Sequence, residues 1–126
     1  MFNKEIFERD DIEGKHVKIY GAIAGIKQYR AGSIFASVIQ DVIKEYDISN
    51  KFLEIGVAHE GELSYFGDSV YLLLSKKDED TIYEYQTGQE IIVYGEVVQC
   101  WNGPFIIPRY IEIAEVAFPH VELEKN

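Results

Sequence analysis

Two stretches of the sequence share one pattern, and that pattern constrains the fold more than any other feature. Each begins with a glycine, continues with apolar residues at alternating positions and carries a second glycine: residues 14–23 read GKHVKIYGAI and residues 88–97 read GQEIIVYGEV. Such alternation is typical of a strand with one buried face. Glycine permits the bulges and the tight coil that a strand needs to close a small barrel. The repeated pattern therefore predicts two strongly curved strands.

Three further segments have the composition of strands. Residues 51–59, KFLEIGVAH, and residues 67–77, GDSVYLLLSKK, read as an antiparallel pair with a long connection. Residues 104–116, PFIIPRYIEIAEV, read as a last long strand that follows the second glycine stretch. Five strands of this kind are enough to form a small barrel.

The last strand carries two local signals, one before it and one inside it. Asn102 and Gly103 tolerate positive φ, which predicts a tight reversal before the strand. Pro108 has no N–H to donate, so we expect an edge or a bulge at this position. The tail at residues 118–126 leaves no room for another buried element and is expected to be a surface wrap or a frayed end.

Residues 33–46 favour an amphipathic helix between the first two strands. Their apolar residues recur at i, i+1, i+4 and i+5 with polar residues opposite, and Ser33 has the chemistry of an N-cap. The alternative is a strand buried on both faces, because many of these residues are β-branched. A second, short helix is predicted before the second glycine stretch, where Thr81 and Glu84 have capping-box spacing and Gly88 follows.

The order of these elements, with the two glycine patterns on the first and fourth strands, resembles the OB-fold. Within that fold it is most similar to the small nucleic-acid-binding and tRNA-anticodon-binding-like OB domains. The resemblance covers residues 14–116 and implies a mostly β, five-stranded OB-like barrel, with the helix at about 33–46 inserted and a short helix before strand four. A minimal OB domain has no helix between strands one and two. We expect residues 1–126 to form a single OB-like domain with flexible or surface-wrapped ends.

The resemblance also implies where a ligand would bind. OB domains of this kind use the face of strands two and three, with the loop after strand one and the loop between strands four and five. The expected ligand-binding residues in these places are Lys27, Tyr29, Arg30, Trp101, Phe105 and Arg109. Bases stack on aromatic rings, and Lys and Arg meet the phosphates. The competing interpretation is that Trp101 and Tyr29 fold back over the barrel as core caps.

The charge distribution leaves several partners open. The formal net charge is −10, which argues against binding long nucleic acid by the overall field, yet residues 14–40 contain no Asp or Glu and carry Lys15, Lys18, Lys27 and Arg30. Weak binding of single-stranded DNA or RNA is the first hypothesis. A protein partner of the acidic surface, or a homo-oligomer through the inserted helix, is the second. A sugar stacked on Trp101 is the third.

Catalytic, metal and membrane signals are weak, so no enzymatic activity, metal or other cofactor is expected. His16, His59 and His120 are widely separated, and Cys100 is the single cysteine. The N-terminal stretch mixes charged and apolar residues and does not read as a signal peptide. No run reaches the roughly 18 apolar residues of a membrane span. We therefore expect a cytoplasmic location.

Overall fold

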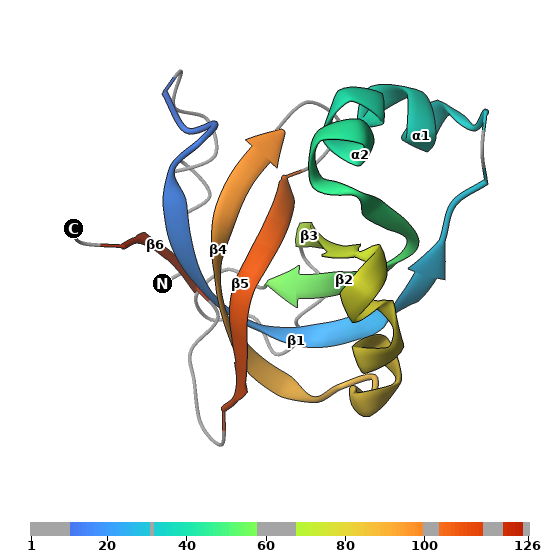
Figure 1. Cartoon of the computed structure of the whole chain (residues 1–126). Helices are drawn as coiled ribbons and strands as arrows, with labels where there is room; N and C mark the ends of the chain where they lie inside the picture. The colour runs from blue at the N-terminus through green and yellow to red at the C-terminus, as the bar shows by residue number, and fades with distance from the viewer. Residues whose placement is uncertain (1–10, 31, 58–67, 100–103, 115–119, 125–126) are drawn as a thin grey trace.

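A computed structural model describes residues 11–30, 32–57, 68–99, 104–114 and 120–124. Within these residues, six strands and three short helices follow one another (Figure 1). In order they are β1 (His16–Gln28), α1 (Ile34–Val38), α2 (Gln40–Tyr46), β2 (Ile48–Val57), β3 (Asp68–Ser75), the 3₁₀ helix η2 (Lys76–Glu84), β4 (Glu90–Gln99), β5 (Phe105–Ile113) and β6 (His120–Leu123).

Strands β1 to β5 close into a barrel in the order β2-β3-β5-β4-β1, with β1 returning to β2. The long β1 makes this closure possible: its first half pairs antiparallel with β4, and its second half pairs antiparallel with β2. Strands β3 and β5 complete the ring through a short parallel pairing of Tyr71 with Phe105 and of Leu72 with Ile106. The predicted five-stranded, mostly β barrel is confirmed.

Bulges bend the strands at the positions that the sequence indicated. The pairing of β1 with β2 shifts register between Ile23 and Gly25. The pairing of β4 with β5 shifts between Gly95 and its neighbour, where Gly95 faces Pro108, so the predicted bulge at Pro108 is confirmed. A Cβ on Gly95 would lie 2.6 Å from the Ile107 carbonyl oxygen, and only glycine therefore fits this close approach.

The two glycine patterns lie on the neighbouring strands β1 and β4 and are hydrogen-bonded to each other. Gly14 and Gly88 both have positive φ, at 88° and 87°. The Gly14 N–H donates to the Val97 carbonyl at 2.7 Å, and the Gly88 N–H donates to the Ile23 carbonyl at 2.7 Å. The first residue of each pattern is thus hydrogen-bonded to the last residue of the other pattern.

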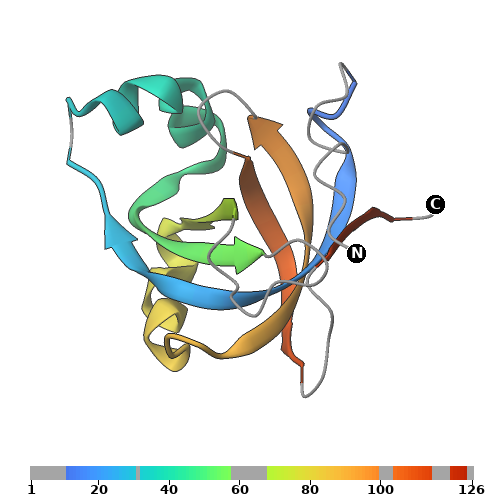
Figure 2. The same cartoon turned by 180° about the vertical axis from the view of Figure 1, so that it is seen from behind.

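The helix predicted at 33–46 is confirmed, as two short helices with Ile39 between them. The Ser33 hydroxyl accepts the Ala36 N–H at 3.1 Å, as an N-cap does. Asp47 ends α2 in the left-handed conformation, and its N–H donates to the Ile43 carbonyl. The insertion lies against the outer surface of the barrel, and both views place it on the opposite side from β6 (Figures 1 and 2).

The short helix before β4 is also confirmed, but it begins earlier than its capping signal suggested. It is a 3₁₀ helix that starts at Lys76, so Thr81 lies inside it and its hydroxyl donates to the Asp78 carbonyl. Ile82 is the residue that this helix buries in the barrel. The helix therefore closes one end of the barrel with an aliphatic side chain.

The C-terminal tail contains a strand that the sequence did not predict. Strand β6 pairs antiparallel with β1, with Val17 opposite Leu123. Leu123 packs against the barrel interior, and the Glu124 N–H donates to the His16 carbonyl. A strand of four residues is too short for an alternation signal to stand out. Among the described residues, no helix is long and apolar enough to cross a membrane.

Two clusters of buried side chains result. The barrel core fills the interior and consists of Ile12, Val17, Ile19, Ile23, Leu53, Ile55, Val70, Leu72, Leu74, Ile82, Ile91, Val93, Val97 and Ile106. The outer core lies between the inserted helices and the outer face of the sheet and consists of Tyr29, Ala36, Ile39, Ile48, Phe52, Leu73 and Phe105.

Candidate functional site

The outer core occupies the face on which the sequence placed a ligand. Its aromatic rings, together with Tyr71 of β3, form a series from the residue after β1 to β5. The ring centroids of Tyr29 and Phe52 are 6.2 Å apart, those of Phe52 and Tyr71 are 5.8 Å apart, and those of Tyr71 and Phe105 are 5.3 Å apart and stacked. Side chains of α1 and α2 pack against this series. The helices therefore cover much of the outer surface of β2 and β3.

Tyr29 and Phe105, two of the expected ligand-binding residues, are buried in the outer core. Phe105 is 1% exposed, and Tyr29 is 9% exposed with its hydroxyl donating to the Ser49 carbonyl at 3.1 Å. Burial raises the pKa of the Tyr29 phenol above its ordinary value. Tyr29 is thus the core cap of the competing interpretation, while one side of its ring also borders a pocket. Their roles in binding remain predictions.

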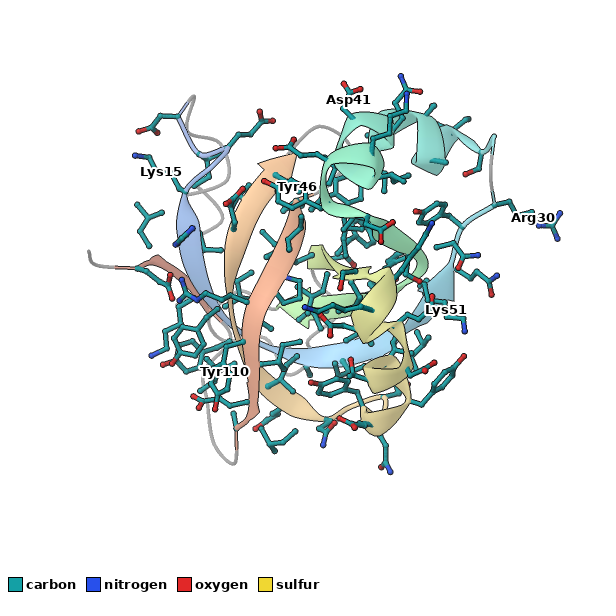
Figure 3. The ribbon with its side chains drawn as sticks, viewed as in Figure 1. Lys15, Arg30, Asp41, Tyr46, Lys51 and Tyr110 are labelled. Carbon is teal, nitrogen blue, oxygen red and sulfur yellow. The ribbon has the colours of Figure 1, made fainter. Side chains whose placement is uncertain are left out.

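The expected cations fall into two groups. Lys27 and Arg30 are both exposed near the end of β1, and the Lys27 ammonium lies 3.9 Å from the Glu54 carboxylate. Arg30 points away from the body of the molecule (Figure 3). Arg109 lies instead beside the start of β1, where it donates to Glu124 at 2.6 Å and lies 3.3 Å from Nδ1 of His16. The structure therefore brings Lys27, Tyr29 and Arg30 together and separates Arg109 from them.

Trp101 lies outside the described residues, as do the reversal at Asn102 and Gly103 and the thiol of Cys100. Both strands that flank this connection are described. Val98 of β4 packs against the outer core, and Phe105 of β5 belongs to it. The described residues on both sides of this connection therefore pack in or against the outer core.

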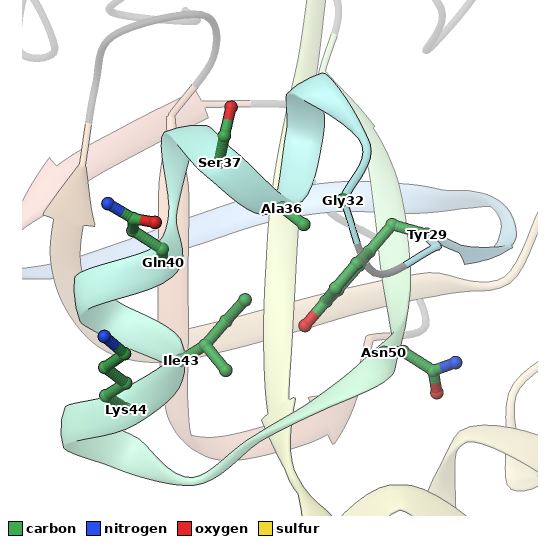
Figure 4. A pocket seen from close by; sticks show the side chains of 8 residues that line it. All are labelled: Tyr29, Gly32, Ala36, Ser37, Gln40, Ile43, Lys44 and Asn50. Carbon is green, nitrogen blue, oxygen red and sulfur yellow. The ribbon is translucent and has the colours of Figure 1, made fainter.

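A pocket of about 410 Å³ opens between the inserted helices and the start of β2. Its lining residues are Tyr29, Gly32, Ala36, Ser37, Gln40, Ile43, Lys44 and Asn50 (Figure 4). The ring of Tyr29 points across the pocket toward Ile43. The walls of the pocket are largely apolar. A volume of this size is in the range of about 300–1,000 Å³ that small-molecule sites occupy.

Sequence reasoning missed the polar residues of this pocket. The helical pattern assigned Gln40 and Lys44 to the solvent side of residues 33–46, and both are indeed exposed. The pocket arises because α2 packs beside Tyr29, which follows β1, and Asn50 of β2, and the Tyr29 N–H donates to the Asn50 carbonyl at 3.0 Å. The sequence held one signal for these residues: the amphipathic helix is predicted in the connection after the first strand, which is expected to bind ligand.

A second group of polar and aromatic residues lies on the other side of the barrel, on the outer face of β1, β4 and β5. The Lys18 ammonium lies 4.9 Å from the ring centroid of Tyr20 and 5.5 Å from that of Tyr94. The Tyr94 ring is tilted against Tyr110, with centroids 5.8 Å apart. A hydrogen bond with Tyr20, followed by smaller effects of Tyr94, raises the pKa of Lys18 despite some desolvation. These contacts keep the lysine charged.

Among the described residues, no group of three or more His, Cys, Asp or Glu side chains could hold a metal ion. Two acidic side chains, one on β2 and one on the 3₁₀ helix, accept hydrogen bonds from serine hydroxyls. Glu79 accepts a hydrogen bond from the Ser49 hydroxyl at 2.6 Å, and Glu54 accepts one from the Ser69 hydroxyl at 2.7 Å. The arrangement is suited to binding through an apolar wall, amides and cations.

No protein-family model matches the chain, and no curated protein sequence matches it. Several solved structures resemble it in fold. An OBody, AM1L10, bound to hen egg-white lysozyme has a TM-score of 0.56 and 18% identity, over 90% of this chain and 91% of that chain. A chain of the S. pombe Stn1–Ten1 complex has a TM-score of 0.51 and 13% identity, over 81% of this chain and 60% of that chain.

Asparaginyl-tRNA synthetase from Pyrococcus horikoshii, complexed with asparaginyl-adenylate, is similar as well. Its TM-score is 0.52 and its identity 14%, over 94% of this chain. The chain spans only 23% of the synthetase chain and 60% of the Stn1–Ten1 chain. At such identities the likeness concerns the fold, and it shows that the chain has the OB fold.

Proposed function

We propose that this OB-fold domain is a non-enzymatic module that binds single-stranded DNA or RNA weakly, through the β1–β2 and β4–β5 connections. One observation carries the proposal: described residues in or beside both connections pack into the outer core. Tyr29 and Ala36 lie in or beside the first connection, and Phe105 follows the second, yet all three side chains belong to one cluster. A strand bound beside this cluster would contact both connections at once, as OB domains require.

The charges near the β1–β2 connection support the same partner. Lys27, Arg30 and Lys44 are exposed there and can contact phosphates. The proximity of Glu54 to Lys27 and the net charge of −10 both weaken attraction to a polyanion. Binding is therefore proposed to be weak and strongly dependent on salt.

The similar structures support the proposal by analogy only. One of them is an asparaginyl-tRNA synthetase, so the OB fold also occurs in that protein. Fold analogy cannot identify a ligand by itself, because OB barrels carry many functions. The proposal consequently depends on how the residues beside the two connections pack in the outer core.

The test is fluorescence anisotropy with labelled single-stranded DNA and RNA of about 12 nucleotides, within the site sizes known for OB folds. We expect saturable binding at about 50 mM salt that weakens sharply at about 200 mM. Arg30→Ala should weaken binding several-fold and reduce the salt slope by about 1, because one phosphate contact is lost.

The matched control for Arg30→Ala is Lys15→Ala. It removes the same charge from an exposed side chain, and the two residues lie on opposite sides of the molecule (Figure 3). The control should leave affinity nearly unchanged. Equal losses in the two variants would indicate attraction to overall charge, and an absence of saturable binding at low salt would refute the proposal.

A protein partner is the second candidate, favoured by the apolar surface beside the same connection. Ile34, at the start of α1, is 80% exposed, and Ile26 near the end of β1 is 42% exposed. Exposed apolar side chains of this size often mark protein contacts when they form a patch. The OBody, which shares the fold, is bound to lysozyme, and the S. pombe chain belongs to a two-protein complex.

Light scattering over a range of concentrations tests self-association, the simplest form of this candidate. Ile34→Asp is the suitable variant because its side chain is exposed, whereas Val38 and Val42 pack against the outer core. A larger mass that Ile34→Asp restores to the monomer value would favour the protein interface. A constant monomer mass would exclude self-association through α1.

A further inference from the structure

The pocket beside α2 exists because this barrel carries an insertion between β1 and β2. Five of its eight lining residues belong to α1 and α2, and a sixth, Gly32, precedes them. A minimal barrel without these helices would have no such pocket. We propose that it holds one nucleobase, splayed out of the bound single strand. This inference rests on the proposed function and deepens it.

The walls of the pocket suit a planar, partly apolar ligand. One face is the ring of Tyr29, and Ala36 and Ile43 supply aliphatic surface (Figure 4). The Tyr29 ring is held in place by its hydrogen bond to the Ser49 carbonyl and by its contact with Phe52. A ring that is already ordered loses little conformational freedom when a base packs on it.

The polar groups of the pocket suit the edge of a base. Gln40 and Asn50 each offer an amide with both donors and an acceptor. Within the described part of the chain, neither side-chain amide has a hydrogen-bond partner. Unstacked bases in single strands present mixed donors and acceptors on their edges, which amide side chains match. An aliphatic ligand would leave these amides unused, and a purely anionic ligand would use only their N–H donors.

The cations around the pocket suit the phosphates next to such a base. Lys44 lines the pocket, and Arg30 is exposed two residues before Gly32. Gly32 has φ of 84°, and a Cβ there would meet nothing within 4 Å, so the chain leaves open space at this point. Asp41 and Glu45 are also exposed on α2 but do not line the pocket. The nearest charge to the bound base is therefore positive.

The first measurement uses the four nucleoside monophosphates as probes and follows the side-chain amide signals of Gln40 and Asn50 by NMR. Saturable movement of both signals, with a preference among the four bases, is the expected result. The second measurement repeats the oligonucleotide titration with Gln40→Met, which keeps the length of the side chain and removes its amide. Loss of one hydrogen bond to a base edge should weaken binding about fivefold.

Gln86→Met is the matched control, because Gln86 is exposed and lies outside the pocket. It should bind the oligonucleotide as the unaltered chain does. If the oligonucleotide binds but the monophosphates leave both amides unmoved, or Gln40→Met binds normally, the pocket assignment is wrong and the proposed function stands. If no oligonucleotide binds, the proposed function fails and the splayed base fails with it.

Discussion

The barrel core and the outer core differ in chemistry, although they share strands. Every buried member of the barrel core is aliphatic, whereas the outer core contains the rings of Tyr29, Phe52 and Phe105. Neighbouring residues separate the two clusters: Phe52 faces outward and Leu53 inward, because side chains alternate across a sheet. The barrel core thus makes the fold, and the outer core attaches an insertion to it and borders the pocket.

This difference suggests that the two cores contribute to stability in different ways. Strands around the barrel are all connected by hydrogen bonds, so a defect inside it affects the whole ring. The inserted helices contact the barrel through one side only, and helices of five and seven residues are not stable alone. A defect in the outer core should release the helices before it unfolds the barrel.

The largest expected effect comes from a cavity in the barrel core. Ile19 is fully buried on β1, which pairs with β4 and β6 at this position. Ile19→Ala should lower the free energy of unfolding by about 4 kcal/mol, since truncating a buried Ile costs about 2–5 kcal/mol. Urea denaturation followed by circular dichroism measures it. A loss below about 1 kcal/mol would contradict a close-packed barrel.

A cavity in the outer core should have a smaller global effect and a larger local one. Ile39 is fully buried between α1 and α2. Ile39→Ala should lower the free energy of unfolding by about 2–3 kcal/mol. Hydrogen exchange should show lost protection across residues 34–46 while β1 and β4 amides remain protected. Equal loss of protection in helices and barrel would show that the two cores unfold as one unit.

The smallest expected effect is a pH dependence of stability that comes from tyrosines in and beside the outer core. Burial raises the pKa of Tyr29 and Tyr71 above the ordinary value of 10.0, and Glu54 adds to the shift at Tyr71. The folded chain therefore keeps these phenols protonated longer than the unfolded chain does. Their contribution to stability is complete below pH 10 and is lost as the pH rises through the folded-state pKa, with a slope of at most about 1.4 kcal/mol per pH unit for each group.

Tyr29→Phe tests this dependence. It removes the hydrogen bond to the Ser49 carbonyl and should cost about 1 kcal/mol at neutral pH. The variant should lose less further stability than the unaltered chain between about pH 9 and about pH 11, because one ionising group is gone. Urea denaturation at several alkaline pH values measures the slope. An unchanged slope would mean that the Tyr29 phenol contributes nothing to alkaline unfolding.

The barrel was predictable because its signals are local. Glycine at positions 14, 88 and 95, and alternation through β1 and β4, act within a few residues. The Ser33 cap and the bulge at Pro108 were predictable for the same reason. Strand β6 was missed because its pairing with β1 joins residues about a hundred positions apart and leaves only a short segment to recognise.

The candidate site was predictable only in part. Lys27, Tyr29 and Arg30 lie within four consecutive positions, so the sequence necessarily grouped them. The pairing of Arg109 with Glu124 depends on β6, and the pocket residues Gln40 and Asn50 depend on how α2 packs. Such long-range contacts leave no pattern in a single sequence.

What the sequence by itself determined is the inward face of the barrel and the identity of its elements, because steric limits on glycine and alternation of side chains operate between neighbours. Only the tertiary structure decided which outer faces of those elements are covered by the inserted helices. The insertion folds onto the outer faces of β2, β3 and β5, buries Tyr29 and Phe105, and leaves a pocket at its edge. The physical reason is packing: apolar rings on an outer face are buried by whichever segment can reach them.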